Sequence, residues 1–94
     1  MAEPHIDVAT VRRLAREQRV VAHPTRYHAS KHGFGFIACA TALEHCYAVK
    51  VDPLRQRAWY ALASHTHDRT LRVDFDAVED EDGALLLVVT AYHV

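Results

Sequence analysis

The spacing of apolar residues changes near Asp52 and Pro53, and this change constrains the possible folds more than any other feature of the sequence. Before this turn, apolar residues recur at helical intervals, and after it they alternate with polar residues, as in strands. In residues 71–76, leucine, valine and phenylalanine alternate with arginine and aspartate, which predicts a strand with one buried and one solvated face. The buried face needs a covering layer, which helices from the first half of the chain can supply.

Two helices are predicted in this first half. Asp7 occupies the position of an N-cap, and apolar residues at helical spacing after it predict a helix over residues 7–19. The second helix starts after Gly35 and ends near Tyr47 or Ala48. Its apolar stripe, which we expect to face the core, consists of Phe36, Cys39, Ala40, Leu43, Cys46 and Tyr47. The two cysteines on this stripe lie about 10 Å apart along a helix axis, too far for a disulfide, so we expect both to be reduced core residues.

Three segments with strand character follow, at residues 58–65, 71–78 and 84–94. An acidic turn over residues 79–83 joins the last two, and the final strand is apolar on both faces, which is typical of a central strand. Residues 49–51 suit a short strand, and residues 20–30 suit a connection or a short edge strand. The predicted fold is α+β, with two helices packed on a three- to four-stranded antiparallel sheet in a single domain over residues 1–94.

Length and composition limit the class of protein. The 94 residues suffice for one domain, and a chain that is 50% apolar and 24% charged is typical of globular rather than disordered proteins. The longest apolar run, residues 84–89, has six residues, whereas a membrane-spanning helix needs about 20. Residues 1–10 contain no apolar segment of the kind found in secretory signals. We therefore expect a cytoplasmic protein with no membrane partner.

Charge is divided unevenly along the chain. Residues 1–72 contain eleven basic and six acidic side chains, a net charge of +5, whereas residues 73–94 contain six acidic and no basic side chains, a net charge of −6. Such a chain can present a basic face to phosphate or to an acidic partner, and an acidic face elsewhere. Alternatively, strand pairing interleaves the two sets and removes the contrast.

The densest cluster of titratable and cationic side chains lies just before the second predicted helix, where His28, Lys31 and His32 precede Gly33. Cleavage of RNA without a metal needs a base for the 2′-hydroxyl proton, an acid for the leaving oxygen and a cation for the developing phosphate charge. Histidine and lysine can fill these roles. The alternative interpretation is a helix start with solvated histidine and lysine side chains.

A second group of candidate residues comes from the strands. Arg57 precedes one predicted strand, and Arg69 and Arg72 flank another. If the last two strands are antiparallel neighbours, the end of the final strand, with Tyr92 and His93, lies close to Arg72. These residues can then form a pocket. Alternatively, they are solvated sheet residues, with Tyr92 packed partly under a helix.

Other chemistries have less support. His65 and His67 do not belong to a motif with metal-ligand spacing, so no metal site is predicted. A glycine-rich phosphate loop, a nucleophile elbow and a Walker motif are also missing, so no cofactor is predicted. A cysteine nucleophile is not expected either, because both cysteines lie on the apolar stripe rather than in an exposed electropositive site.

Two short segments resemble a known family. Residues 31–36, Lys-His-Gly-Phe-Gly-Phe, resemble the segment that opens a helix in BrnT-like toxins and their relatives in the RelE-type ribonuclease superfamily. Residues 85–92 resemble the hydrophobic strand that closes the sheet in the same family. The resemblance covers residues 26–94, and the helix over residues 7–19 is an addition to this toxin-like core.

The resemblance implies the toxin of a type II toxin–antitoxin pair, a metal-independent endoribonuclease that cleaves RNA and is silenced by a cognate antitoxin protein. It allows a homodimer or a toxin–antitoxin hetero-oligomer. The candidate catalytic residues are His28, Lys31, His32, Arg57 and Tyr92. The candidate nucleic-acid-binding residues are Arg26, Lys31, Arg69 and Arg72.

Two alternatives to this function stay open. A non-catalytic protein-binding module on the same fold would dock its partner through the acidic turn or through the basic N-terminal helix. A metal-dependent hydrolase that uses the histidines would lose activity with chelators.

Overall fold

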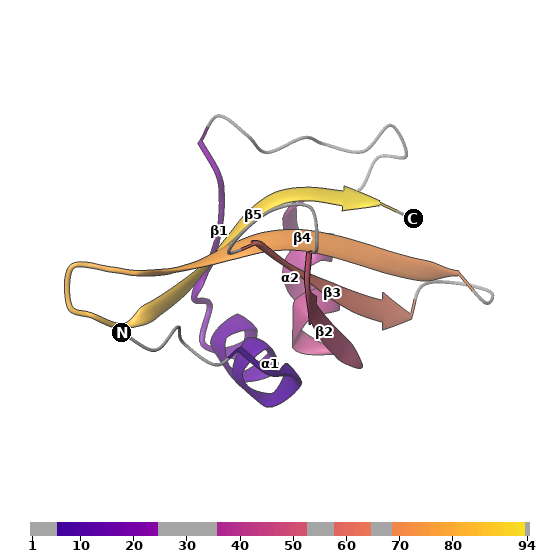
Figure 1. The fold of residues 1–94 in the computed structure, drawn as a ribbon, viewed down its shortest axis with the longest axis horizontal. Helices are drawn as coiled ribbons and strands as arrows, with labels where there is room; N and C mark the ends of the chain where they lie inside the picture. Colours follow the sequence, from indigo (N-terminus) through magenta and orange to yellow (C-terminus); the bar gives the residue numbers. More distant parts are fainter. Residues whose placement is uncertain (1–5, 25–35, 53–57, 65–68, 94) are drawn as a thin grey trace.

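A computed structural model of the protein describes residues 6–24, 36–52, 58–64 and 69–93. These residues form two helices and five strands (Figure 1). In chain order the elements are α1 (Val8–Arg16), β1 (Val20–Ala22), α2 (Phe36–Glu44), β2 (Ala48–Val51), β3 (Ala58–Ser64), β4 (Thr70–Glu79) and β5 (Leu85–His93). The fold class is therefore α+β, as the sequence predicts.

The five strands form one mixed sheet in the order β1-β5-β4-β3-β2. Neighbours from β2 to β5 pair antiparallel, whereas β1 pairs parallel with β5, with Val20 opposite Leu87 and Ala22 opposite Val89. The predicted sheet of three or four antiparallel strands is thus wrong in strand number and in the direction of β1. The physical reason is that β1 has three residues, too few for a period-two pattern, and that its partner lies at the other end of the chain.

α1 has a clear start and a clear end. The Asp7 carboxylate accepts a hydrogen bond from the Thr10 backbone N–H at 2.8 Å, which satisfies one of the unpaired donors of the first turn. Gln18 has a φ of 61°, in the left-handed region, and the Arg19 N–H then donates to the Leu14 carbonyl at 2.8 Å. This arrangement ends helices at their C-terminus, so α1 is shorter than the predicted helix over residues 7–19.

α2 places its buried residues between α1 and the sheet. Cys39 and Leu43 are fully buried, as the predicted stripe requires, whereas Cys46 is a buried free thiol that lies beyond the end of the helix. Tyr47, at the end of that stripe, is exposed, because the helix ends at Glu44. The predicted stripe is therefore correct in the middle of the helix and wrong at its end.

Both helices lie on the same face of the sheet, and the hydrophobic core fills the space between the two layers (Figure 1). The buried sheet residues of this core are Val20, Ala61, Ala63, Leu71, Val73, Phe75, Leu87, Val89 and Tyr92, and the partly buried sheet residues packed against it are Val49, Trp59, Ala77 and Leu85. We call the opposite face, which neither of the described helices covers, the open face. None of the helices in the described part of the chain is long and apolar enough to cross a membrane.

Candidate functional site

Polar side chains gather on the open face where β3, β4 and β5 are paired. Arg72 on β4 is the cross-strand neighbour of His93 on β5, and Asp74 follows Arg72 on the same face. Tyr60 on β3 is the cross-strand neighbour of Asp74, and Asp52 comes directly after β2. We call these five residues, Asp52, Tyr60, Arg72, Asp74 and His93, the open-face cluster.

A β-bulge in β5 brings His93 into this cluster. Val89 and Ala91 pair with successive residues of β4, so Thr90 between them is an extra residue. The Thr90 hydroxyl donates a hydrogen bond to the Asp74 carbonyl oxygen at 3.4 Å. Because the extra residue reverses the alternation of faces beyond it, His93 points to the open face instead of toward the helices.

Two carboxylates and an aromatic ring hold Arg72. Its Nε donates to Asp74 Oδ1 at 2.7 Å, and its Nη2 donates to Asp52 Oδ2 at 3.3 Å. Its Cζ lies 4.1 Å from the centroid of the Tyr60 ring, within the range of a cation–π contact. These neighbours raise the pKa of Arg72 above its ordinary value, the hydrogen bond to Asp74 contributing most. The guanidinium is therefore a permanent and oriented positive charge.

Asp74 also faces His93. Asp74 Oδ2 lies 3.3 Å from His93 Nε2, a distance that permits an ion pair when the imidazole is protonated. The Asp74 side chain is 9% exposed, whereas the His93 side chain is 62% exposed. Since Nε2 faces the carboxylate, Nδ1 is the nitrogen that can reach a ligand. The cluster thus combines an accessible proton acceptor with a fixed cation.

The formal charges of the cluster do not cancel. Asp52 and Asp74 contribute two negative charges and Arg72 one positive charge, so the net charge is −1 while His93 is neutral. Protonation of His93 brings the net charge to zero. A ligand that enters this cluster with a negative charge alone therefore meets repulsion from the carboxylates.

Tyr92 does not join Arg72. It is 3% exposed and packs in the core on the helix-covered face, in register with Val73. The pocket expected from Arg72 and Tyr92 therefore does not form, because the bulge at Thr90 turns Tyr92 inward and His93 outward. The expected proximity between Arg72 and the end of the final strand is confirmed.

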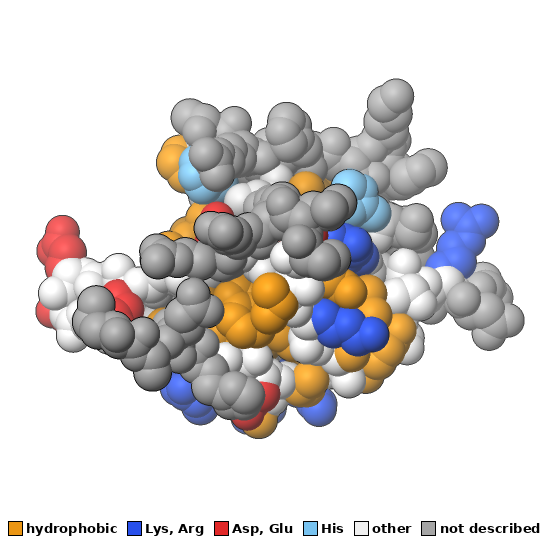
Figure 2. Space-filling view, viewed as in Figure 1, with side chains coloured by type: hydrophobic (Ala, Val, Ile, Leu, Met, Phe, Trp, Pro, Cys, Tyr) orange, Lys and Arg blue, Asp and Glu red, His pale blue; other side chains and the backbone are white. Residues whose placement is uncertain are grey.

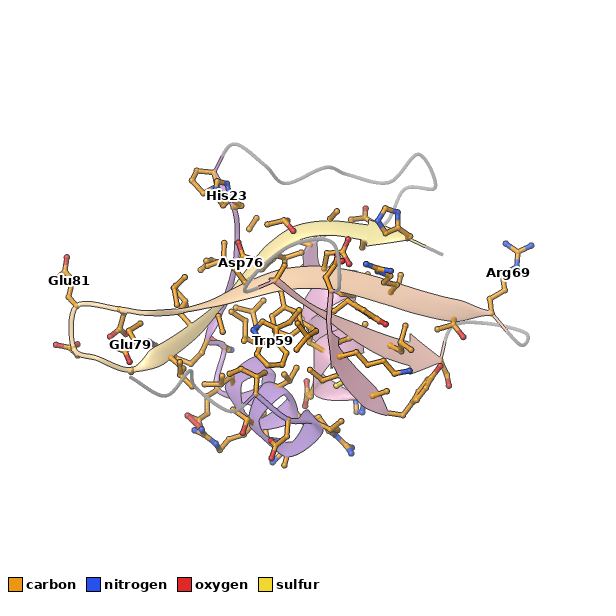
Figure 3. The ribbon with its side chains drawn as sticks, viewed as in Figure 1. His23, Trp59, Arg69, Asp76, Glu79 and Glu81 are labelled. Carbon is orange, nitrogen blue, oxygen red and sulfur yellow. The ribbon has the colours of Figure 1, made fainter. Side chains whose placement is uncertain are left out.

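The other predicted site residues fall into two groups. Arg69 lies just before β4 and projects from the end of the sheet, away from the other labelled side chains (Figure 3). The second group lies outside the described residues and consists of Arg26, His28, Lys31, His32 and Arg57.

The sequence predicts that Asp74 shares the solvated face with Arg72, but it does not predict that Asp74 binds Arg72 or that Asp52 and Tyr60 join the cluster. A signal for Asp74 exists, because it alternates with core residues and shares the solvated face with Arg72. Asp52 has no such signal, since it precedes Pro53 in an ordinary turn sequence and its partner lies 20 residues further along the chain.

A groove of about 400 Å³ lies between α1, β1 and α2. Its lining is mostly apolar, and Ile37 at its border is 80% exposed. The charged side chains along it are those of Arg16 and Glu44. The complete lining is Ala15, Arg16, Gln18, Val20, Phe36, Ile37, Ala40, Thr41 and Glu44.

Acidic side chains gather at the tip of the β4–β5 hairpin (Figure 2). Glu79, Glu81 and Asp82 are exposed there, whereas Asp80 forms an ion pair with Arg19. The charge contrast between the two parts of the chain is thus partly retained on the surface and partly cancelled by pairing.

Among the described residues, no three side chains of His, Cys, Asp or Glu are arranged to bind a metal ion. Comparisons of this chain with protein-family models, with curated proteins and with solved structures gave no match. The functional conclusion is therefore based on the open-face cluster and on the sequence motifs.

Proposed function

We propose that the protein is a metal-independent endoribonuclease that acts as the toxin of a type II toxin–antitoxin pair. The observation that carries this proposal is the juxtaposition of His93 and Arg72 on adjacent strands, with Asp74 in contact with both. A histidine next to a carboxylate can act as the base in metal-free RNA cleavage, and the guanidinium beside it can orient the nucleotide. The resemblance of residues 31–36 and 85–92 to BrnT-like and RelE-type toxins supports the same class.

The proposed reaction begins with proton transfer. His93 Nδ1 takes the proton of a ribose 2′-hydroxyl, and Asp74 stabilises the imidazolium that results. The 2′-oxygen bonds to the adjacent phosphorus, the bond between phosphorus and the 5′-oxygen breaks, and an acid protonates that 5′-oxygen. We assign this acid to His32 or His28. The products are a 2′,3′-cyclic phosphate and a 5′-hydroxyl, and the reaction needs no cofactor.

Cations outside the open-face cluster are proposed to hold the phosphates. Lys31 and Arg57 contact the scissile phosphate, and Arg26 and Arg69 contact phosphates elsewhere on the RNA. Arg72 is not assigned a phosphate, because two of its five N–H groups already bind carboxylates.

Induced expression in a bacterial host tests the proposal. We expect the wild type to arrest growth and degrade total RNA, and His93→Ala or His32→Ala to relieve both effects while the protein stays soluble. The matched control is His23→Ala, because His23 lies at the end of β1 and outside the open-face cluster (Figure 3). Normal growth and intact RNA in cells that contain soluble wild-type protein would contradict the proposal.

The proposed toxin also needs a cognate antitoxin protein, which forms a hetero-oligomer with it or with its homodimer. Co-purification of a tagged wild-type protein from its native host tests this partner. A protein that binds with fixed stoichiometry and blocks RNA cleavage is the expected result.

A non-catalytic protein-binding module is the second candidate, and the groove beside α1 favours it. The groove combines an apolar lining with exposed Ile37, and the outer side of α1 carries Arg12, Arg13 and Arg16. An acidic amphipathic helix has the chemistry that fits such a surface. In this case Ile37→Glu or charge reversal of the three arginines abolishes partner binding, whereas His93→Ala leaves function intact.

A further inference from the structure

Arg72 directs its strongest hydrogen bonds into the protein. Nε and Nη2 both donate to carboxylates, and the side chains of these carboxylates, Asp74 and Asp52, are about nine-tenths buried. A phosphate that binds the remaining edge of the guanidinium would lie close to both negative charges. Because like charges repel strongly in a partly buried site, phosphate binding is a poor use of this arginine.

The flat surface of the guanidinium is better placed to bind a ligand than its edges are. Tyr60 lies on one side of it, with its ring centroid 4.1 Å from Cζ, yet the Arg72 side chain is still 38% exposed. Asp52 and Asp74 fix two edges of the group, so it cannot rotate freely. A guanidinium that is held in this way can stack on a nucleobase, and the neighbouring carboxylates do not repel a neutral base.

We propose that Arg72, supported by Tyr60 and fixed by Asp52 and Asp74, is a stacking platform for one unpaired nucleobase of RNA. This inference rests on the proposed function and names the part of the substrate that the open-face cluster recognises. His93 is the cross-strand neighbour of Arg72, so the imidazole lies beside the nucleotide whose base is stacked. A base in a duplex is already stacked on both sides, so the platform selects single-stranded RNA.

Binding of an oligoribonucleotide that cannot be cleaved tests the platform separately from catalysis. The probe is a single strand of about ten nucleotides, a length within the range of single-strand binding sites, with 2′-O-methyl groups throughout and 2-aminopurine as one base. Stacking quenches 2-aminopurine fluorescence, so a titration reports both affinity and stacking. We expect quenching by the wild type and affinity at least tenfold lower for the same probe in duplex form.

Variants separate stacking from charge. Arg72→Lys keeps the positive charge but removes the planar group, and Tyr60→Leu removes the support, so each is expected to weaken binding about tenfold and to abolish quenching. Arg13→Lys makes the same chemical change on α1, away from the open face, and should bind the probe like the wild type. Circular dichroism verifies the fold, and Tyr60→Leu decides the question if Arg72→Lys does not fold.

Several results would overturn the platform. One is wild-type protein that does not quench the fluorescence of the probe. Another is an Arg72→Lys variant with unchanged affinity and quenching. A third is equal affinity of the wild type for a probe in which an abasic site replaces 2-aminopurine. Quenching without RNA cleavage in a separate assay would retain the platform and reject the ribonuclease, so the two proposals can fail independently.

Discussion

At the scale of single residues, the open-face cluster depends on Asp74. Its Oδ1 accepts the hydrogen bond from Arg72 Nε, and its Oδ2 faces His93 Nε2. A carboxylate with so little exposure needs such partners, because burial removes the water that would otherwise stabilise its charge. Asp74 therefore links the orientation of the proposed base to that of the neighbouring cation.

Asp74→Asn keeps the size of this side chain and removes its charge. We expect the free energy of unfolding to fall by about 1–3 kcal/mol, because Arg72 loses a charge-assisted hydrogen bond, and RNA cleavage to fall at least tenfold. Urea denaturation and a cleavage assay measure the two effects. Asp82→Asn, in the exposed hairpin turn, is the control and should change stability by less than about 0.5 kcal/mol. Equal stability and activity of the two variants would contradict this role for Asp74.

The pH dependence of stability has a defined source at Asp80. An ion pair with Arg19, assisted by backbone N–H groups of Ala84 and Asp82, lowers the pKa of the Asp80 carboxyl below its ordinary value of 3.8. A carboxyl whose pKa is lower in the folded state stabilises that state above the unfolded pKa, and this contribution disappears as pH falls through the folded pKa.

Asp80→Asn should therefore lower the free energy of unfolding at about pH 6, and its difference from the wild type should shrink steadily below about pH 4. Urea denaturation of both proteins at several pH values measures this difference. Asp82→Asn is again the matched control, because it changes a neighbouring carboxylate in the same turn. A difference that stays constant down to about pH 2.5 would show that the ion pair with Arg19 is not the source.

At the scale of elements, the bulge in β5 decides which residues form the site. The final strand is apolar on both faces in sequence, and the structure places Leu87 and Val89 in the core. Uninterrupted alternation from these two residues would place Tyr92 on the open face and His93 in the core. The structure has the reverse, because Thr90 is an extra residue in β5. A bulge of this kind has no signature in a run of apolar residues, so the sequence predicts the strand but not the faces beyond the bulge.

Removal of Thr90 tests this explanation. Deletion makes Val89 and Ala91 consecutive in a regular ladder, so Tyr92 should stay in the core, His93 should stay on the open face and RNA cleavage should be retained. Thr90→Ala keeps the residue count and removes the hydroxyl that donates to Asp74, so it should cost about 1 kcal/mol and leave cleavage within about twofold. Urea denaturation and cleavage rates measure both variants. Loss of cleavage in a folded deletion variant would contradict the explanation, because Thr90 would then not be an extra residue that regular pairing can omit.

How well the sequence predicts each of the other elements depends on how far apart along the chain the residues that form it are. The Asp7 cap and the buried stripe of α2 depend on residues close in sequence. The cap is predicted correctly, and the stripe is predicted correctly at Cys39 and Leu43 but not at the end of the helix. β1 depends on pairing with the distant strand β5, and the contact between Arg72 and Asp52 likewise joins separate elements. Local patterns allow a short edge strand within residues 20–30 but contain no signal for its parallel pairing with β5 or for the contact between Arg72 and Asp52. The sheet is therefore underestimated and the cluster incomplete when the sequence is considered alone.

At the scale of the whole molecule, the sheet separates two surfaces with different chemistry. One face packs against the helices and forms the hydrophobic core with them. The groove between α1, β1 and α2 lies on this side of the sheet. The other face holds the open-face cluster. The open-face cluster and the groove therefore lie on opposite sides of the sheet.

Cleavage of a defined RNA by the purified protein is the most direct test of the ribonuclease proposal. The assay follows a labelled single-stranded oligoribonucleotide with EDTA present, identifies the product ends by mass spectrometry, and compares the wild type with His93→Ala and His23→Ala. We expect 2′,3′-cyclic phosphate ends, a rate lower by about 100-fold or more for His93→Ala, and an unchanged rate for His23→Ala. Intact RNA with folded wild-type protein, or cleavage unaffected by His93→Ala, would contradict the proposed role of the open-face cluster.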